Sequence, residues 1–288
     1  MASISLNRLR YGRFNSALLR KCLSYYFREG VAYRVQFGPI RGMKLYYDRS
    51  VNFHAILGLW EAEEYTFLQR VLTAGEFLQE RMVVADVGAN LGIFSLWSTR
   101  LLEGREHRVF AFEPAPDTLT KLRDNIAING LGTIDVVPSA CADREGTTEF
   151  FVGFHHHASS LLKEWAHSEP SPTATSVTVP TTTLDAFFSE QQAPDLIKMD
   201  IEGGGIFALK GCAHILSTKR PLVWVESHTP AEDRAISDTL AAYDYCAYRF
   251  TDRRAVMHPD TTHPDPDGVW GTLLLYPREQ HRRIAEAL

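Results

Sequence analysis

The chain has 288 residues, of which 45% are hydrophobic and 23% charged, and its formal net charge is -5 at pH 7. This composition excludes a disordered or collagen-like chain and fits one large domain, or one domain with an extension. No uninterrupted apolar run approaches the roughly 20 residues of a membrane-spanning helix, and the first residues lack a signal-peptide pattern. Four widely spaced cysteines without a Cys-x-x-Cys pair predict neither a zinc site nor a redox dithiol. We therefore expect a cytoplasmic protein without a transmembrane segment.

Charge is distributed unevenly along the chain. Residues 1–44 contain nine basic groups and a single acid, Glu29, so the remainder is acidic. Such a basic arm is typical of a solvated helix face, although it also suits an anionic surface or a partner subunit, and we consider a homodimer formed through it. The acidic body disfavours nucleic acid as a partner.

Residues 1–75 are expected to form an extension that packs on the core. Apolar residues recur at helical spacing from about Phe14 to Phe27, and Tyr33–Tyr47 alternates as two short strands around turns. Asn52–Leu72 is helical again, with a break near Gly58.

Residues 76–288 are expected to form an α/β domain. Short apolar strands alternate with amphipathic helices, which is typical of a parallel sheet whose strands are buried on both faces. The expected strands are Met82–Val87, Val109–Phe112, Ile134–Val137, Leu196–Met199 and Leu222–Val225. The expected helices are Ile93–Leu102, Pro114–Ile128, Ile206–Leu216 and Ala231–Ala242. A final pair, Tyr245–Phe250 and Trp270–Tyr276, completes a doubly wound, mostly parallel seven-stranded sheet with an antiparallel C-terminal strand.

An additional strand pair interrupts this pattern. Thr147–Val152 and Ser176–Val179 read as paired strands joined by a polar loop with His155-His156-His157. Side chains of adjacent residues in an extended loop point in alternating directions, so three consecutive histidines rarely bind one ion. We interpret this loop as a lid, and we expect it and a second loop, Thr251–Val269, to shape the pocket for the substrate.

The strongest motif is Asp86-Val87-Gly88-Ala89-Asn90-Leu91-Gly92, which follows a predicted strand and opens a predicted helix. Glycines at such a turn let the backbone bend tightly and approach a ligand. A dinucleotide-binding fingerprint would have a second glycine where this chain has Asn90. The motif therefore favours a nucleoside ligand without a pyrophosphate.

Two further features belong to the same predicted nucleoside site. Glu113 ends the next strand, 21 residues after Gly92, where a carboxylate accepts hydrogen bonds from both ribose hydroxyls. The alternative is a solvated glutamate at a strand end. Small residues within Ser139–Asp143, notably Ala140 and Cys141, would let an adenine ring lie against the backbone; otherwise this is an ordinary turn.

The chain resembles the FkbM family of S-adenosylmethionine (SAM)-dependent methyltransferases over about Trp60 to Pro277. The matching pieces are Trp60-Glu61, Asp86 to Gly92, Phe112-Glu113-Pro114, Asn125, Asn129, Leu131, Thr183-Leu184-Asp185 and Asp195 to Gly203 with its Lys-x-Asp-x-Glu-Gly string. The resemblance implies SAM as methyl donor, S-adenosyl-L-homocysteine as product, and a hydroxyl on a sugar, polyketide or similar small metabolite as acceptor. The expected cofactor-binding residues are Asp86, Gly88, Ala89, Asn90, Gly92, Glu113, Pro114, Ala140, Cys141 and Asp200. Trp60 and Glu61 either pack in the core or cover the cofactor.

One position departs from the family pattern. The family has a further glutamate shortly after Asp-x-Glu-Gly, whereas this chain has Gly205. Three consecutive glycines also open a helix that would prefer better helix formers. Either that glutamate is dispensable, or activity is altered or lost, or the position was changed.

Methyl transfer to an alcohol requires that the acceptor lose its proton, which calls for a general base or a metal ion. The candidates are Asp200, Glu202, Glu226 and His228, which come at the ends of two neighbouring strands. His228 suits the base role because its ordinary pKa is near neutral, although it also reads as a surface histidine. Glu202 can instead bind the SAM amino group or cap the following helix, and the three carboxylates would suit Mg²⁺. We assign no metal ligand.

Two other functions remain open at this point. One is an NAD-dependent oxidoreductase on the same fold, which Asn90 and the carboxylate-rich fourth strand disfavour. The other is a SAM-binding module with lost or altered catalysis, for which Gly205 is the only support.

Overall fold

The computed structural model describes residues 26–48, 52–152, 159–161, 175–250, 256–258 and 271–288. Most of the expected helix Phe14–Phe27 lies outside the described residues, as do the basic residues up to Lys21 and the loop histidines His155-His156-His157. The loop Thr251–Val269 is described only at residues 256–258. Within the described residues, no helix is long and apolar enough to cross a membrane.

The described N-terminal segment contains one hairpin and two helices. Strands β1 (Ala32–Arg34) and β2 (Lys44–Tyr46) pair antiparallel, as expected. Helices α3 (Asn52–Leu57) and α4 (Ala62–Ala74) are separated at Gly58, which has φ +73°. A Cβ atom there would lie 1.9 Å from the Phe37 carbonyl oxygen, so this close backbone approach requires glycine. The predicted break is thus confirmed. The division of the chain at residue 75 stays a prediction.

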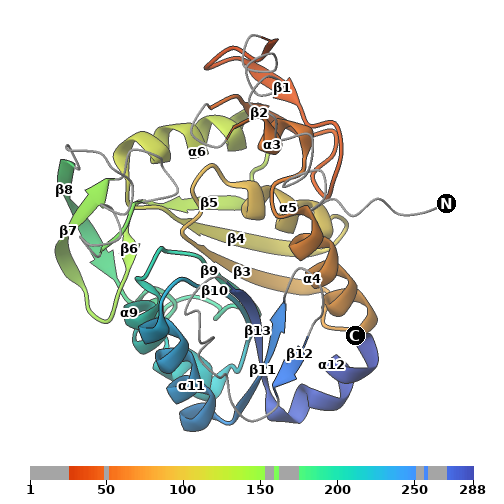
Figure 1. Ribbon diagram of the computed structural model, residues 1–288, viewed down its shortest axis with the longest axis vertical. Helices are drawn as coiled ribbons and strands as arrows, with labels where there is room; N and C mark the ends of the chain where they lie inside the picture. The colour runs from red at the N-terminus through yellow and green to blue at the C-terminus, as the bar shows by residue number, and fades with distance from the viewer. Residues whose placement is uncertain (1–25, 49–51, 153–158, 162–174, 251–255, 259–270) are drawn as a thin grey trace.

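The central sheet confirms the expected fold class (Figure 1). Its strand order is β12-β11-β13-β10-β9-β3-β4-β5. The strands are β3 (Arg81–Val87), β4 (Glu106–Phe112), β5 (Ile134–Val137), β9 (Leu196–Met199), β10 (Leu222–Ser227), β11 (Tyr245–Phe250), β12 (Val256–His258) and β13 (Gly271–Pro277). β3, β4, β5, β9 and β10 run parallel, and β13 lies antiparallel to β10 and β11. The three-residue β12 adds a short edge to the seven expected strands.

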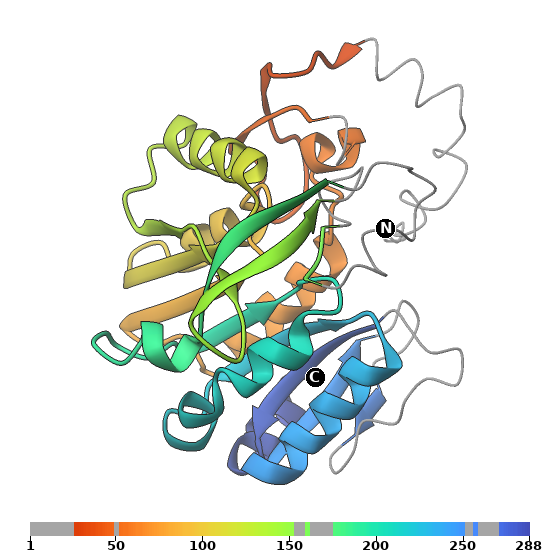
Figure 2. The ribbon, with the colours of Figure 1, turned by 90° about the vertical axis from the view of Figure 1, so that its left-hand side faces the viewer.

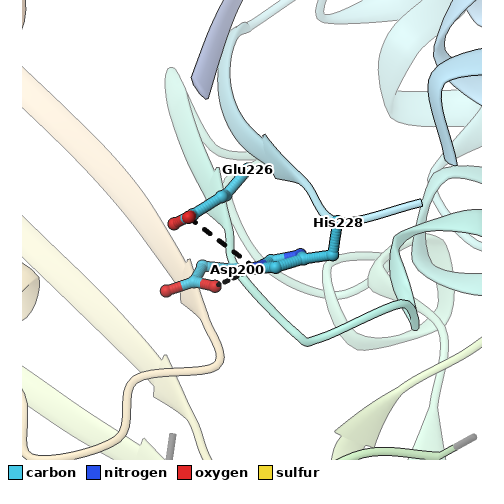
Figure 3. Close-up of side chains that lie close together, drawn as sticks. All are labelled: Asp200, Glu226 and His228. Carbon is cyan, nitrogen blue, oxygen red and sulfur yellow. Dashed lines mark ion pairs between the residues drawn. The ribbon is translucent and has the colours of Figure 1, made fainter. Parts of the chain in front are cut away.

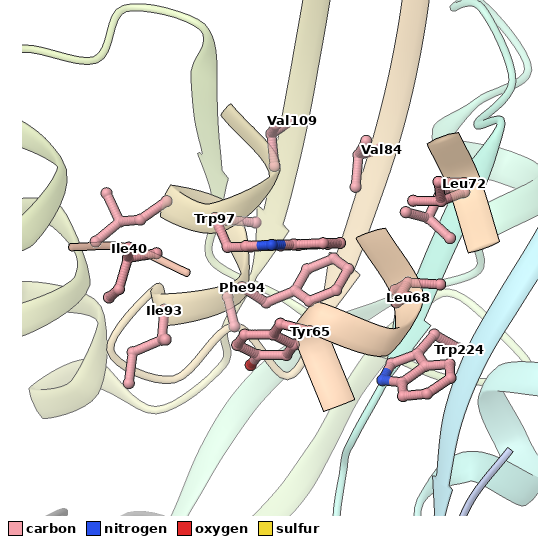
Figure 4. Packing of buried hydrophobic residues seen from close by; sticks show 14 of the residues in the cluster. Ile40, Tyr65, Leu68, Leu72, Val84, Ile93, Phe94, Trp97, Val109 and Trp224 are labelled. Carbon is pink, nitrogen blue, oxygen red and sulfur yellow. The ribbon is translucent and has the colours of Figure 1, made fainter. Parts of the chain in front are cut away.

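Helices cover both faces of this sheet, because alternate residues of each buried strand point to opposite sides. On β3, Val84 joins one apolar cluster and Val83 the other. The Val84 cluster includes Trp97 and Tyr65, whose rings stack 5.3 Å apart (Figure 4). Residues of α4, α5 (Ile93–Leu101), α6 (Pro116–Ile128) and α12 (His281–Ala287) pack in this cluster. The Val83 cluster includes residues of α8 (Leu184–Phe187), α9 (Gly205–Lys210), α10 (Ala213–Thr218) and α11 (Pro230–Tyr243).

The additional strand pair forms a separate small sheet, which faces the viewer in Figure 2. β7 (Gly146–Val152) and β8 (Thr175–Thr182) pair antiparallel, which confirms the prediction. β6 (Ala140–Cys141) pairs parallel with the end of β8. The segment expected to be a turn beside adenine is therefore partly a strand.

One expected helix is divided. Instead of a continuous Ile206–Leu216, the chain forms α9 and α10 with a break at Gly211. A Cβ atom on Gly211 would lie 2.0 Å from the Ala142 carbonyl oxygen, so the chain passes too close to the small sheet for a side chain. Apolar periodicity continues across the break, and for that reason the pattern alone did not reveal it.

Candidate functional site

A cavity of about 660 Å³ opens at the carboxyl ends of β3, β4, β9 and β10. This is the edge at which parallel α/β sheets bind ligands, and the volume lies in the usual range for small-molecule sites. The predicted site residues in its lining are Gly88, Ala89, Asn90, Glu113, Pro114, Ala140, Cys141, Asp200, Glu202, Glu226 and His228.

The loop after β3 crosses the tip of β4. The N–H groups of Gly88 and Ala89 both donate to the Phe112 carbonyl, at 3.0 and 2.9 Å. Gly88 has φ +79°, and a Cβ atom there would lie 2.0 Å from the Asp200 carbonyl oxygen. Gly88 also lines the cavity, so its approach to a ligand stays a prediction, and the structure adds a second reason for glycine. The structure requires glycine there because the loop passes against the end of β9.

Asp86 and Gly92 do not line the cavity, although we expected both to contact the cofactor. Asp86 is fully buried and accepts a 2.6 Å hydrogen bond from Ser95 Oγ, which ties β3 to α5. Gly92 has φ +85°, and its missing side chain leaves room for Leu122 of α6. Both residues therefore shape the loop from behind.

Glu113 is 94% buried at the end of β4 and still lines the cavity, which rules out a solvated glutamate. Its two carboxylate oxygens accept from the N–H groups of Asn90 and Ala115, at 3.0 and 2.9 Å. Burial raises the pKa of Glu113 to about 7, although these two hydrogen bonds oppose the rise. Each carboxylate oxygen has a second lone pair, so the group can still accept hydrogen bonds from a ligand.

Asn90, whose N–H donates to Glu113, also has a buried side-chain acceptor. The side-chain oxygen of Asn90 is buried and accepts no hydrogen bond among the described residues. Asn90 also lines the cavity and has φ +50°. A buried acceptor of this kind suits a ligand N–H or O–H.

His228 lies among three carboxylates on the other side of the cavity. Its Nε2 atom is 3.5 Å from Asp200 Oδ1, 3.6 Å from Glu202 Oε2 and 3.7 Å from Glu226 Oε1. Figure 3 shows the imidazole ring directed between Asp200 and Glu226. We call these four residues the acidic cluster. All four come from the ends of β9 and β10, as expected.

Electrostatics within the acidic cluster favour a positively charged His228. Burial lowers its pKa, but the surrounding carboxylates outweigh burial and raise that pKa to about 10. Burial also raises the pKa of Glu202 to about 7 and that of Glu226 well above its usual value. A histidine that holds its proton near neutral pH is a poor base. The role of each member of the acidic cluster stays a prediction, and the raised pKa of His228 favours a carboxylate over His228 as the base.

Lys198 connects the two sides of the cavity, and we assigned it no role from the sequence. It is 94% buried on β9, and its Nζ atom donates to the Gly88 carbonyl at 2.9 Å. The same atom lies 3.4 Å from Asp200 and 3.6 Å from Asp86. Burial lowers the pKa of Lys198, but Asp200 and Asp86 raise it above its ordinary value, so the ammonium stays charged. A lone lysine within the apolar strand Leu196–Met199 was the available signal.

Trp60 and Glu61, just before α4, also line the cavity. Trp60 packs against the main apolar cluster as well, which confirms the packing role, and its role in covering the cofactor stays a prediction. Glu61 has φ +46° and accepts a 2.6 Å hydrogen bond from the Tyr65 hydroxyl. The N-terminal segment thereby contributes two residues to the lining of the cavity.

Another carboxylate occupies the space in front of Gly205. Glu232 of α11 places Oε1 3.0 Å from the Gly205 N–H, and a Cβ atom on Gly205 would lie 2.8 Å from the same oxygen. The position of Gly205 therefore does face a carboxylate, which comes from another helix.

The acidic cluster also has the donor types of a cation site. Single donor atoms of Asp200, Glu226 and His228 lie within 4.8 Å of one another. The raised pKa of His228 favours a positive charge on its own ring beside these carboxylates.

Comparisons with known proteins show the family of the chain. Residues 86–250 match the Methyltransferase FkbM domain family. Hexuronic acid methyltransferase AglP of Haloferax volcanii is 28% identical over 169 residues, which cover 58% of this chain and 64% of that protein.

Two solved structures are also similar to the chain. Methyltransferase FkbM from Methylobacillus flagellatus KT is 16% identical with a TM-score of 0.47, and the match covers 80% of this chain and 63% of that one. TYW2 of M. jannaschii, solved in complex with AdoMet, is 12% identical with a TM-score of 0.40 over 81% of this chain and 80% of that one. The chain thus spans less than two thirds of the length of AglP and of the M. flagellatus protein.

Proposed function

We propose, from the premise that this chain belongs to the family of the methyltransferase FkbM domain, that it transfers a methyl group from SAM to a hydroxyl of a small, sugar-like acceptor. The observation that carries the proposal is a single cavity with two different walls. One wall is made of backbone, Asn90 and Glu113, and the other is the acidic cluster.

The first wall fits the nucleoside of SAM. Glu113 presents carboxylate oxygens at the end of β4, where they can accept from ribose hydroxyls, and the buried oxygen of Asn90 accepts another hydrogen bond. Ala140 and Cys141 line the cavity with small side chains, which suit contact with the adenine ring. When bound, SAM supplies an activated methyl group on a sulfonium.

The acidic cluster would prepare the acceptor. The carboxylates of Glu202 and Glu226 are stronger bases than solvated glutamates because burial raises their pKa. One of these two carboxylates accepts the proton of the acceptor hydroxyl while the hydroxyl oxygen attacks the methyl group. The positive charge of His228 limits the negative charge on the acidic cluster. Asp200 and Lys198 hold the end of β9 against the Gly88 loop, which keeps the two walls in register.

The acceptor class rests on similarity to AglP, whose name states hexuronic acid as its substrate. That likeness covers part of each chain, so we carry over only the broader class, a hydroxylated sugar or similar small metabolite.

Calorimetry and a transfer assay test the proposal. We expect the purified full-length protein to bind SAM and S-adenosylhomocysteine and to ignore NAD. Incubation with methyl-labelled SAM and a panel of neutral sugars, uronic acids and polyketide alcohols should transfer label to one class. Binding of NAD without SAM would favour the oxidoreductase, and SAM binding without transfer to any acceptor would favour the non-catalytic module.

A further inference from the structure

Glu232 is a buried carboxylate that the proposed chemistry does not use. It is 98% buried in the first turn of α11, three residues after the N-cap Thr229. A glutamate at this position normally turns back and accepts from the N–H of its own N-cap residue. Here Oε2 accepts from the His228 N–H at 2.8 Å, and Oε1 accepts from the Gly205 N–H at 3.0 Å. One side chain therefore joins the end of β10 to the start of α9.

The same carboxylate faces the back of the His228 ring. Glu232 Oε2 lies 3.7 Å from His228 Nδ1, whereas Nε2 of the same ring faces Asp200, Glu202 and Glu226. A carboxylate behind one ring nitrogen orients the imidazole and favours a proton on that nitrogen. At 3.7 Å the Glu232 carboxylate is too far from Nδ1 for a hydrogen bond, so it acts on the ring through its negative charge and through its hydrogen bond to the His228 backbone, while Nε2 faces the acidic cluster.

Gly205 makes this arrangement possible. Any side chain there would start 2.8 Å from Glu232 Oε1 and 3.6 Å from its carboxylate carbon, so it would compete for the same space. Unlike Gly203, Gly205 does not have a positive φ, so backbone conformation does not explain the glycine. The space that the Glu232 carboxylate occupies explains why residue 205 is glycine.

We propose that Glu232 is a positioning residue for His228, and that residue 205 is glycine because the Glu232 carboxylate fills the space of its side chain. The inference deepens the proposed function and rests on it, because the positioned ring serves the acidic cluster. Four carboxylates face the ring, three from β9 and β10 and one from α11.

The first experiment replaces Glu232 with glutamine in the full-length protein. Glutamine has one oxygen acceptor, so its amide nitrogen must face an N–H donor of either Gly205 or His228. We expect the His228 ring signal in NMR to titrate at lower pH than in the wild type. We also expect kcat to fall by about 10- to 100-fold while the affinity for S-adenosylhomocysteine is unchanged.

Asp117→Asn is the matched control. Asp117 is an exposed acid in the first turn of α6, and α6 begins with a proline as α11 does. This variant loses the same charge at a helix N-terminus without touching the site, so neither the His228 signal nor kcat should change.

A rescue pair keeps the test decisive if Glu232→Gln folds poorly. Gly205→Glu directs a second carboxylate into the occupied space, and Glu232→Ala empties that space, so each change alone should lower kcat. Combined, they return one carboxylate to the gap between α9 and His228, and kcat should recover by about tenfold over Glu232→Ala.

Unchanged titration of His228 in Glu232→Gln, or additive losses in the combined variant, would overturn the proposal. The NMR titration requires neither SAM nor an acceptor, so its result is independent of whether the proposed function is correct. The proposal would also be overturned if Mg²⁺ alone returned the His228 signal of Glu232→Gln to its wild-type titration. A bound cation would then be what orders the acidic cluster.

Discussion

The two walls of the cavity are built differently. The first wall, proposed to bind the nucleoside, is made of main-chain groups, Asn90 and Glu113. The carboxylate oxygens of Glu113 accept from two N–H groups. In the acidic cluster, the carboxylates of Asp200, Glu202 and Glu226 each have an oxygen within 4 Å of His228 Nε2. Hydrogen bonds fix the shape of the first wall. The second wall depends on the balance of positive and negative charges on its side chains. Substitutions should therefore change binding at the first wall and rate at the second.

The largest effect is expected at the acidic cluster. Glu226→Gln removes one of the two carboxylates proposed as base and leaves the size of the side chain unchanged, so kcat should fall by about 10²- to 10⁴-fold. Single-turnover transfer from SAM measures this, with SAM affinity by calorimetry as the second readout. Glu103→Gln, an exposed change at the end of α5, serves as the control. A loss of SAM affinity with normal turnover of the bound complex would erase the distinction between the walls.

Gly88→Ala tests whether the loop after β3 depends on backbone contact. The new Cβ would clash with the Asp200 carbonyl at 2.0 Å and strain a positive φ, so the free energy of unfolding should fall by about 3 kcal/mol. Gly104→Ala has the same strain at φ +84° but open space around it, and should cost about 1 kcal/mol. Urea denaturation compares the two. Equal losses would mean that the contact with β9 contributes nothing.

Glu113→Gln tests whether the first wall affects the binding of SAM. The variant loses the charge that would bind the ribose hydroxyls, so the Kd for SAM should rise by about tenfold or more. The rate of transfer at saturating SAM should stay close to that of the wild type. Calorimetry and a saturation curve separate the two quantities, and an unchanged Kd would remove Glu113 from the cofactor site.

The smallest effects concern pH. The pKa of Glu202 is raised to about 7, so a carboxylate needed as base gains activity as pH rises through 7. The pKa of His228 is raised to about 10, so its positive charge and the activity it supports are lost as pH rises through 10. A plot of kcat/KM against pH should be bell-shaped between these values. Glu202→Gln should remove the rise near 7, and a rise that persists would assign it to another group.

Much of the fold could be predicted because its signals are local. The strands β5, β9 and β11 have the predicted bounds, since each is a short, mostly apolar segment that ends at polar or turn residues. The split of α9 from α10 was missed because its cause, the Ala142 carbonyl, lies about 70 residues away in the chain.

The sequence by itself determined which residues end the strands, and therefore which side chains can reach the ligand edge of a parallel sheet. Asp200, Glu226 and His228 were identified in this way, because the period of a strand and the position of its end are local properties. Only the tertiary structure decided their protonation and their neighbours. The pKa of His228 depends on carboxylates from three elements, and Gly88 and Gly205 are glycines because of atoms that approach from elsewhere in the chain. Burial and through-space charge arise only when distant segments pack, so no local pattern records them.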